Sequence, residues 1–75
     1  MNTAEKLQRD ALVDWLDRNL AKCTDGQLLL FRRMYSHDDL SRSIAEVLQQ
    51  MSERDLKNAV GQVERTAAKF GWEVS

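Results

Sequence analysis

The cluster His37, Asp38 and Asp39 contains the residue types that acid–base catalysis and metal binding use. A transition-metal site needs about three or four donor side chains, and the chain has no second histidine. Aspartates at the start of a helix have another use, because a carboxylate complements the positive end of the helix dipole. We therefore interpret the cluster as a capping loop, with a partner contact as the alternative, and we expect no metal, no cofactor and no catalytic residue.

The rest of the sequence offers no arrangement that would support an enzyme. It contains no glycine-rich phosphate loop, no nucleophile motif and no paired carboxylates. The single Cys23 cannot form an intramolecular disulfide, which favours a reducing, cytoplasmic location. The sequence shows no signal-peptide pattern, and no apolar run reaches the ~18 residues that a membrane span needs.

The composition predicts an all-α fold. The 75 residues allow one domain, residues 1–75, and 43% of them are hydrophobic, which is too many for a disordered chain. There are three glycines and no proline, and good helix formers outnumber β-branched residues. We expect a compact bundle of about four helices, at approximately residues 3–23, 26–36, 43–50 and 53–70.

The first expected helix has an apolar face and an acidic face. Steps of about 100° per residue place six apolar side chains on one side. These are Ala4, Ala11, Leu12, Trp15, Leu16 and Leu20. Asp10, Asp14 and Asp17 form a stripe on the opposite side. We interpret the stripe as a solvated face, and an acidic docking strip is the alternative.

The second expected helix, "LLLFRRMY", is apolar nearly all round. Such a helix usually sits at the centre of a fold, wrapped by the others. Only Arg32 and Arg33 interrupt the apolar surface, and Leu29 projects between them. The sequence therefore predicts a central helix whose arginine edge reaches solvent or a partner.

The last two expected helices have clear start and stop signals. Ser43 and Ser52 are placed as N-caps, as is Thr24 before the second helix. An apolar seam follows along the fourth helix: Leu56, Val60, Val63, Ala67 and Phe70. Gly71 is placed to end that helix in a left-handed turn, with Trp72 folding back on it. Gly61, in the middle of the helix, suggests close approach by another helix, for which we favour one of the same chain over a second copy or a target.

The third and fourth helices also allow a DNA-binding hypothesis, because a tight turn joins them as in a helix-turn-helix. A helix that enters a DNA groove should be basic, whereas this one balances acidic and basic residues. The whole chain carries a net charge of −1, from 11 basic and 12 acidic residues. Nucleic-acid binding is therefore kept only as an alternative.

Two segments, "LLLFRRMYSHDDL" and "MSERDLKNAVGQVERT", resemble small helical accessory proteins of tailed phages and prophages. The resemblance spans residues 28–66 and includes no catalytic motif. It implies an accessory product that binds and inhibits a larger host or defence protein in the cytoplasm of the host cell.

These observations lead to one functional hypothesis, a small non-enzymatic module that binds a larger protein. Arginine offers bidentate and stacking contacts and is enriched in interface hot spots. The predicted contact residues lie on the second helix and the loop after it: Leu29, Arg32, Arg33, Tyr35 and His37. The alternatives are a nucleic-acid-binding regulator and a homo-oligomeric structural subunit, in which the apolar second helix and Gly61 serve self-assembly.

Overall fold

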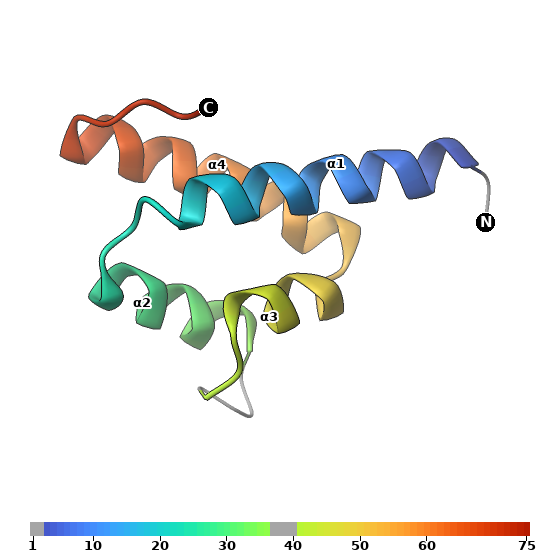
Figure 1. The fold of residues 1–75 in the computed structure, drawn as a ribbon, viewed down its shortest axis with the longest axis horizontal. Coiled ribbons are helices and arrows are strands. Elements are labelled where there is room, and N and C mark those ends of the chain that lie inside the picture. Colours follow the sequence, from blue (N-terminus) through green and yellow to red (C-terminus); the bar gives the residue numbers. More distant parts are fainter. Residues whose placement is uncertain (1–2, 37–40) are drawn as a thin grey trace.

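The computed structural model describes the backbone of residues 3–36 and 41–75, and the side chains of residues 8–36 and 41–75. These ranges contain four helices and no strand: α1 (Thr3–Leu20), α2 (Asp25–Tyr35), α3 (Ile44–Gln50) and α4 (Glu53–Phe70). Figure 1 shows α1 and α4 side by side in one layer, with α2 and α3 in a second layer against them. The predicted all-α bundle of about four helices is confirmed.

Hydroxyl side chains cap three of the helices at the predicted positions. Thr24 Oγ1 accepts a hydrogen bond from Gln27 N at 3.2 Å, and Gln27 Oε1 accepts one from Thr24 N at 2.8 Å. Ser43 and Ser52 each accept an N–H from the third residue of the helix that follows, at 3.2 and 3.1 Å. A cap of this kind stabilises a helix by about 1 kcal/mol. The short connections between the helices are thus specified locally.

The first helix ends at Leu20, three residues before the predicted end at residue 23. Thr24 must adopt an extended backbone, with φ −72° and ψ 164°, to cap α2. The chain therefore leaves the helix earlier, through tight bonds from Lys22 N to Asn19 O (3.1 Å) and from Cys23 N to Leu20 O (3.0 Å). The cap of α2 thus sets the end of α1.

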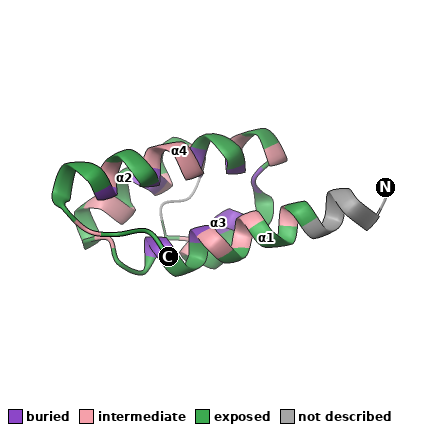
Figure 2. Cartoon of the chain, turned by 90° about the horizontal axis from the view of Figure 1, so that it is seen from above, coloured by how far each residue is buried: buried purple, intermediate pink, exposed green. Residues whose placement is uncertain are grey.

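The hydrophobic core lies between the two layers. Its buried members come from all four helices and the turn before α4: Leu16, Leu20, Phe31, Val47, Leu48, Met51, Leu56, Ala59 and Val63. In Figure 2 the buried positions lie on the inner sides of the helices, and the outer sides are exposed. Burying a leucine-sized side chain contributes about 1.5–3 kcal/mol, so this set holds the layers together.

The predicted seam of α4 is right along most of its length and wrong at its end. Leu56, Val63 and Ala67 are buried, and Val60 is half-buried. Phe70, by contrast, is 61% exposed, because the last turn of α4 faces the open side of α2.

The second helix lies at one edge of the bundle, so its predicted central position is wrong. It packs mainly against α3 and buries only Phe31. Leu30 is 60% exposed and Met34 is 46% exposed. An 11-residue helix that meets the core along one stripe leaves its other apolar side chains uncovered.

Arg9 joins α1 to the end of α3. Its guanidinium donates to Met51 O at 2.7 Å and to Gln49 O at 2.9 Å. These carbonyls belong to the last turn of α3 and its cap, where no partner within the helix is available. The arginine therefore fixes α1 across the turn between α3 and α4.

Asn19 ties the C-terminal segment to α1. Its side chain is fully buried, and Nδ2 donates to Trp15 O at 2.8 Å and to Ser75 O at 3.2 Å. Oδ1 accepts from Ser75 N at 2.9 Å. Gly71 makes the predicted left-handed turn, with φ 78°, and Trp72 packs against the core. The segment after α4 therefore returns along α1.

Among the described residues, Gly61 has no close neighbour that would explain a glycine. A Cβ built at this position meets no atom within 4 Å among the described residues. The prediction that another helix of the same chain approaches Gly61 is therefore wrong.

Candidate functional site

The predicted contact residues of α2 divide into exposed and engaged side chains. Leu29 is 38% exposed and Arg33 is exposed, one helical turn apart. Arg32, by contrast, is partly buried, and its Nε donates to Arg42 O at 2.9 Å. Leu29 and Arg33 can therefore meet a partner directly, whereas Arg32 holds α2 to the segment before α3.

Tyr35 also belongs to the inner side of α2. It is half-buried, and its ring packs on Phe31 with centroids 4.8 Å apart. Burial raises the pKa of Tyr35, the Asp55 carboxylate raises it further and the Arg65 guanidinium lowers it. His37, the last predicted contact residue, lies outside the described residues. The structure thus brings together only part of the predicted set.

A largely apolar groove, with a cavity of about 340 Å³, lies between α2 and α4. Its lining comes from both helices and the end of α1: Leu20, Cys23, Gln27, Leu30, Phe31, Met34, Gln62, Val63, Thr66, Lys69 and Phe70. A neighbouring cavity of about 420 Å³ shares Gln27, Leu30 and Phe70 with it and continues to Trp72. We call the two together the α2–α4 groove.

Large apolar side chains stand exposed along this groove. Leu30, Met34 and Phe70 are each between 46% and 61% exposed, and all three line it. Leu30 and Phe70 belong to both cavities, so they mark its middle. Contiguous exposed apolar surface on a small domain marks a binding site more often than scattered single residues do.

The charged side chains that line the α2–α4 groove are both lysines. Lys69 Nζ lies 5.6 Å from the centroid of the Phe70 ring, and Lys22 Nζ lies 5.6 Å from that of Trp72. No carboxylate is among the described lining residues of either cavity. The groove is thus apolar and basic.

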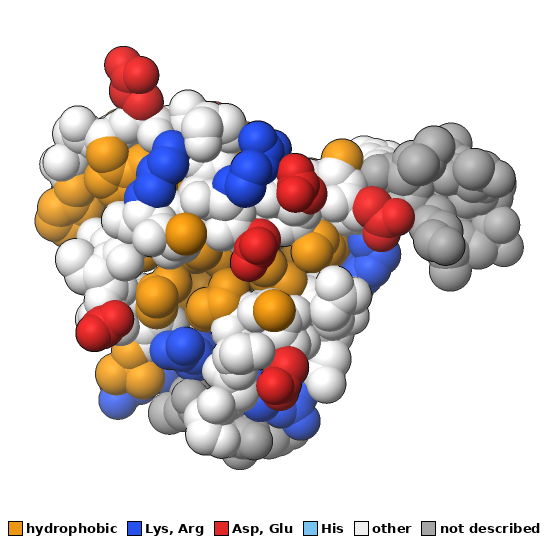
Figure 3. Space-filling view, in the orientation of Figure 1, with side chains coloured by type: hydrophobic (Ala, Val, Ile, Leu, Met, Phe, Trp, Pro, Cys, Tyr) orange, Lys and Arg blue, Asp and Glu red, His pale blue; other side chains and the backbone are white. Residues whose placement is uncertain are grey.

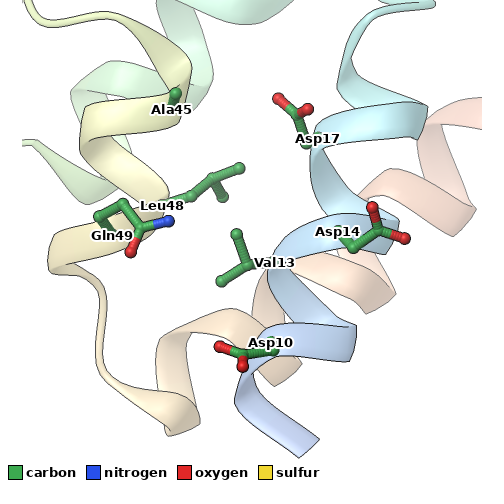
Figure 4. Close-up of a pocket in the computed structure, with 7 residues that line it drawn as sticks. All are labelled: Asp10, Val13, Asp14, Asp17, Ala45, Leu48 and Gln49. Carbon is green, nitrogen blue, oxygen red and sulfur yellow. The ribbon is translucent and has the colours of Figure 1, made fainter. Parts of the chain in front are cut away.

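A second groove, between α1 and α3, has the opposite charge. Its cavity measures about 300 Å³ and is lined by Asp10, Val13, Asp14, Asp17, Ala45, Leu48 and Gln49. Figure 4 shows Val13 and Leu48 pointing toward each other across it, while Asp14 turns away from α3 and pairs with Arg18 at 3.1 Å. Figure 3 shows this face, with carboxylates along the furrow. The acidic stripe is exposed, as predicted, and borders this groove.

The described residues offer little reactive chemistry. No group of three or more His, Cys, Asp and Glu side chains among them could hold a metal ion. Burial raises the pKa of the Cys23 thiol, and a protonated thiol is a poor nucleophile. None of the described helices is both long and apolar enough to cross a membrane.

Comparisons with protein families, with curated proteins and with solved structures gave no match. The likeness to phage accessory proteins therefore stays a prediction.

The sequence predicts core positions for Leu30, Met34 and Phe70, and no pattern in it marks Lys69. One signal pointed the other way: α2 is too short and too apolar all round for a small bundle to cover every side of it. The identity of the uncovered side depended on how α2 lies against α4, which periodicity within one helix does not specify.

Proposed function

We propose that this chain is a small, non-enzymatic protein-binding module whose partner occupies the α2–α4 groove. The observation that carries the proposal is the exposure of Leu30, Met34 and Phe70, from two helices, around one groove. A protein partner would remove this apolar area from water, at about 25 cal/mol per Å².

Leu29 and Arg33 are exposed on the same helix, α2, and neither lines the groove. A partner that fills the groove and wraps over α2 would reach both of them. The resemblance to phage proteins suggests the target class, a larger host or defence protein whose working surface is blocked by the bound module.

Self-association is the second candidate, since a second copy would cover the same apolar side chains. A symmetric dimer buries the same patch on both subunits. Light scattering distinguishes the two functions, because a dimer would have twice the mass of the 8.7 kDa chain. Nucleic-acid binding is tested separately by titration with nucleic acid at several salt concentrations, because such an affinity falls steeply as salt rises.

The decisive experiment is affinity purification of the tagged chain from its source cells, followed by mass spectrometry. We expect a larger protein in stoichiometric amounts with the unmodified chain. It should be lost with the Leu30→Glu/Phe70→Glu double variant and retained with Ala68→Glu, which changes an exposed α4 residue outside the groove. No co-purifying protein, or equal recovery with the double variant, would refute the proposal.

A further inference from the structure

The α2–α4 groove presents mainly side chains to a partner. Backbone groups in the middle of a helix bond within that helix, and the described residues contain no strand whose edge could pair with an extended peptide. Leu30 and Met34, one turn apart on α2, line one side of the groove, and Phe70 on α4 lines the other. A groove between two helices suits the apolar stripe of a third helix, whose side chains recur at i, i+3 or i+4, and i+7.

The lining of the groove favours apolar ligand side chains over polar ones. Leu20, Phe31 and Val63 are buried and line its base. The Thr66 hydroxyl beside them already donates to Gln62 O at 2.9 Å, so it is not a spare donor. Leucine, methionine or phenylalanine side chains of a ligand would therefore fill the groove.

The lysines beside the groove favour a ligand that carries carboxylates on either side of its apolar stripe. The lining lysines have no described carboxylate partner: Lys69 faces an aromatic ring, and Lys22 donates to Glu73 O (2.8 Å) and to Ser75 Oγ (2.9 Å). Carboxylates on a ligand would pair with cations that have no carboxylate partner among the described residues. Complementarity of this kind speeds association and suppresses wrong partners.

The described part of the chain does not itself present such a ligand. The described carboxylate stripe lies on α1, where none of the large hydrophobic side chains among residues 8–20 is exposed. The large exposed ones lie on α2, at the end of α4 and in the segment after it: Leu29, Leu30, Met34, Phe70 and Val74. A symmetric contact through the groove would bring the lysines of both copies to one interface, where like charges repel.

From shape, lining and charge together we infer that the α2–α4 groove binds an acidic amphipathic helix of another protein, with an apolar stripe in the groove and carboxylates beside Lys69 and Lys22. This inference rests on the proposed function and adds the chemical class of the partner segment.

The test is selection of ligands for the full chain from a displayed library of helix-forming peptides randomised along one face. We expect enriched peptides with apolar residues at helical spacing and an excess of Asp and Glu on the flanks. In titrations, Leu30→Glu should abolish binding of the synthesised winners, and Lys69→Glu should weaken it about tenfold, which corresponds to ~1.4 kcal/mol. Arg54→Glu, the same charge reversal near the start of α4, serves as the matched control and should bind normally.

Other outcomes would overturn the inference in distinguishable ways. If the enriched peptides are neutral or basic and their binding is lost in Leu30→Glu, the inference of an acidic ligand helix is refuted and the proposed function stands. The same follows if Lys69→Glu binds acidic winners as tightly as the unmodified chain. If no peptide is enriched and no protein co-purifies from cells, both proposals fail. Circular dichroism of each variant verifies that the helices are intact.

Discussion

The α1–α3 groove and the α2–α4 groove differ in the charge and the exposure of their lining. The first has one cavity of about 300 Å³, and the second has two, of about 340 and 420 Å³. The first is lined by fully buried Leu48 and carries Asp10, Asp14 and Asp17, whereas the second leaves Leu30 and large apolar neighbours exposed to water. The comparison teaches that the exposure of the apolar side chains distinguishes the two grooves, because single cavities of comparable volume occur in both.

The difference follows from how the helices are tied. Arg9 crosses from α1 to the carbonyls of Gln49 and Met51, which holds α1 close to α3. No comparable bond between α2 and α4 appears among the described residues, and these two helices touch only lightly. The α1–α3 pair is therefore tied by side-chain bonds, and no such bond among the described residues ties α2 to α4.

The largest expected effect is a difference in unfolding free energy between alanine variants of two leucines, one at each groove. Leu48→Ala removes a fully buried side chain beneath the acidic groove and should cost about 2–5 kcal/mol of unfolding free energy. Leu30→Ala, on the exposed side of α2, should change it by no more than about 0.5 kcal/mol. Urea unfolding of the two variants measures both values, and equal losses would contradict the placement of Leu48 in the core and of Leu30 at the surface.

The next largest effect is expected when Arg9, which joins α1 to the end of α3, is replaced. Arg9→Met keeps the length of the side chain but leaves backbone carbonyls without their charged donor, and should cost about 1–2 kcal/mol. Lys69→Met, at the other groove, removes a cation that has no described hydrogen bond and should leave stability nearly unchanged. Thermal unfolding of both proteins would refute this contrast if Lys69→Met were the more damaging change.

Substitution at Gly61 sharpens the comparison by probing α4 outside both grooves. Because the space around it is open, Gly61→Ala should stabilise the helix by about 0.5–1 kcal/mol. Partner affinity should stay unchanged, since Gly61 lines neither groove. Increased stability with lost affinity would show instead that the partner approaches this glycine.

The smallest expected effect is a fall in the unfolding free energy at alkaline pH, caused by Cys23 and Tyr35 near the two ends of α2. Burial raises the pKa of Cys23 above its ordinary 9.0 and that of Tyr35 above 10.0. Both groups are neutral when protonated, so the unfolded chain ionises first and stability falls as pH rises through these values. Urea unfolding at neutral pH and above pH 9.0 measures the loss, and Cys23→Ala should reduce it. Equal pH dependence in that variant would contradict the role of the thiol.

Local signals predicted most of the fold, and long-range contacts set the rest. The caps at Thr24, Ser43 and Ser52 and the turn at Gly71 depend on neighbours within a few residues, so the sequence specifies them. The Arg9 and Asn19 bonds join residues 42 and 56 positions apart, and no periodicity anticipates them.

The candidate site was predicted in part. Sequence reasoning selected α2, and Leu29 and Arg33 are exposed there. It chose the arginine edge over the leucine side, because a helical wheel shows which residues share a face without showing which face a neighbouring helix covers. Phe70 continued the apolar spacing of α4 past the point where the core covers it.

The light attachment of α2 has a consequence for how the molecule opens. The described contacts that anchor this helix are those of buried Phe31, of half-buried Leu28 and Tyr35, and the bond from Arg32 to Arg42 O. By contrast, α1 is packed along α4 and α3. Helices with few buried contacts open by local unfolding at a lower free energy than the rest of the fold. Amide hydrogens of α2 should therefore exchange with solvent before those of α1 and α4. A ligand seated in the α2–α4 groove would slow that exchange selectively, making α2 the segment whose order depends on the partner.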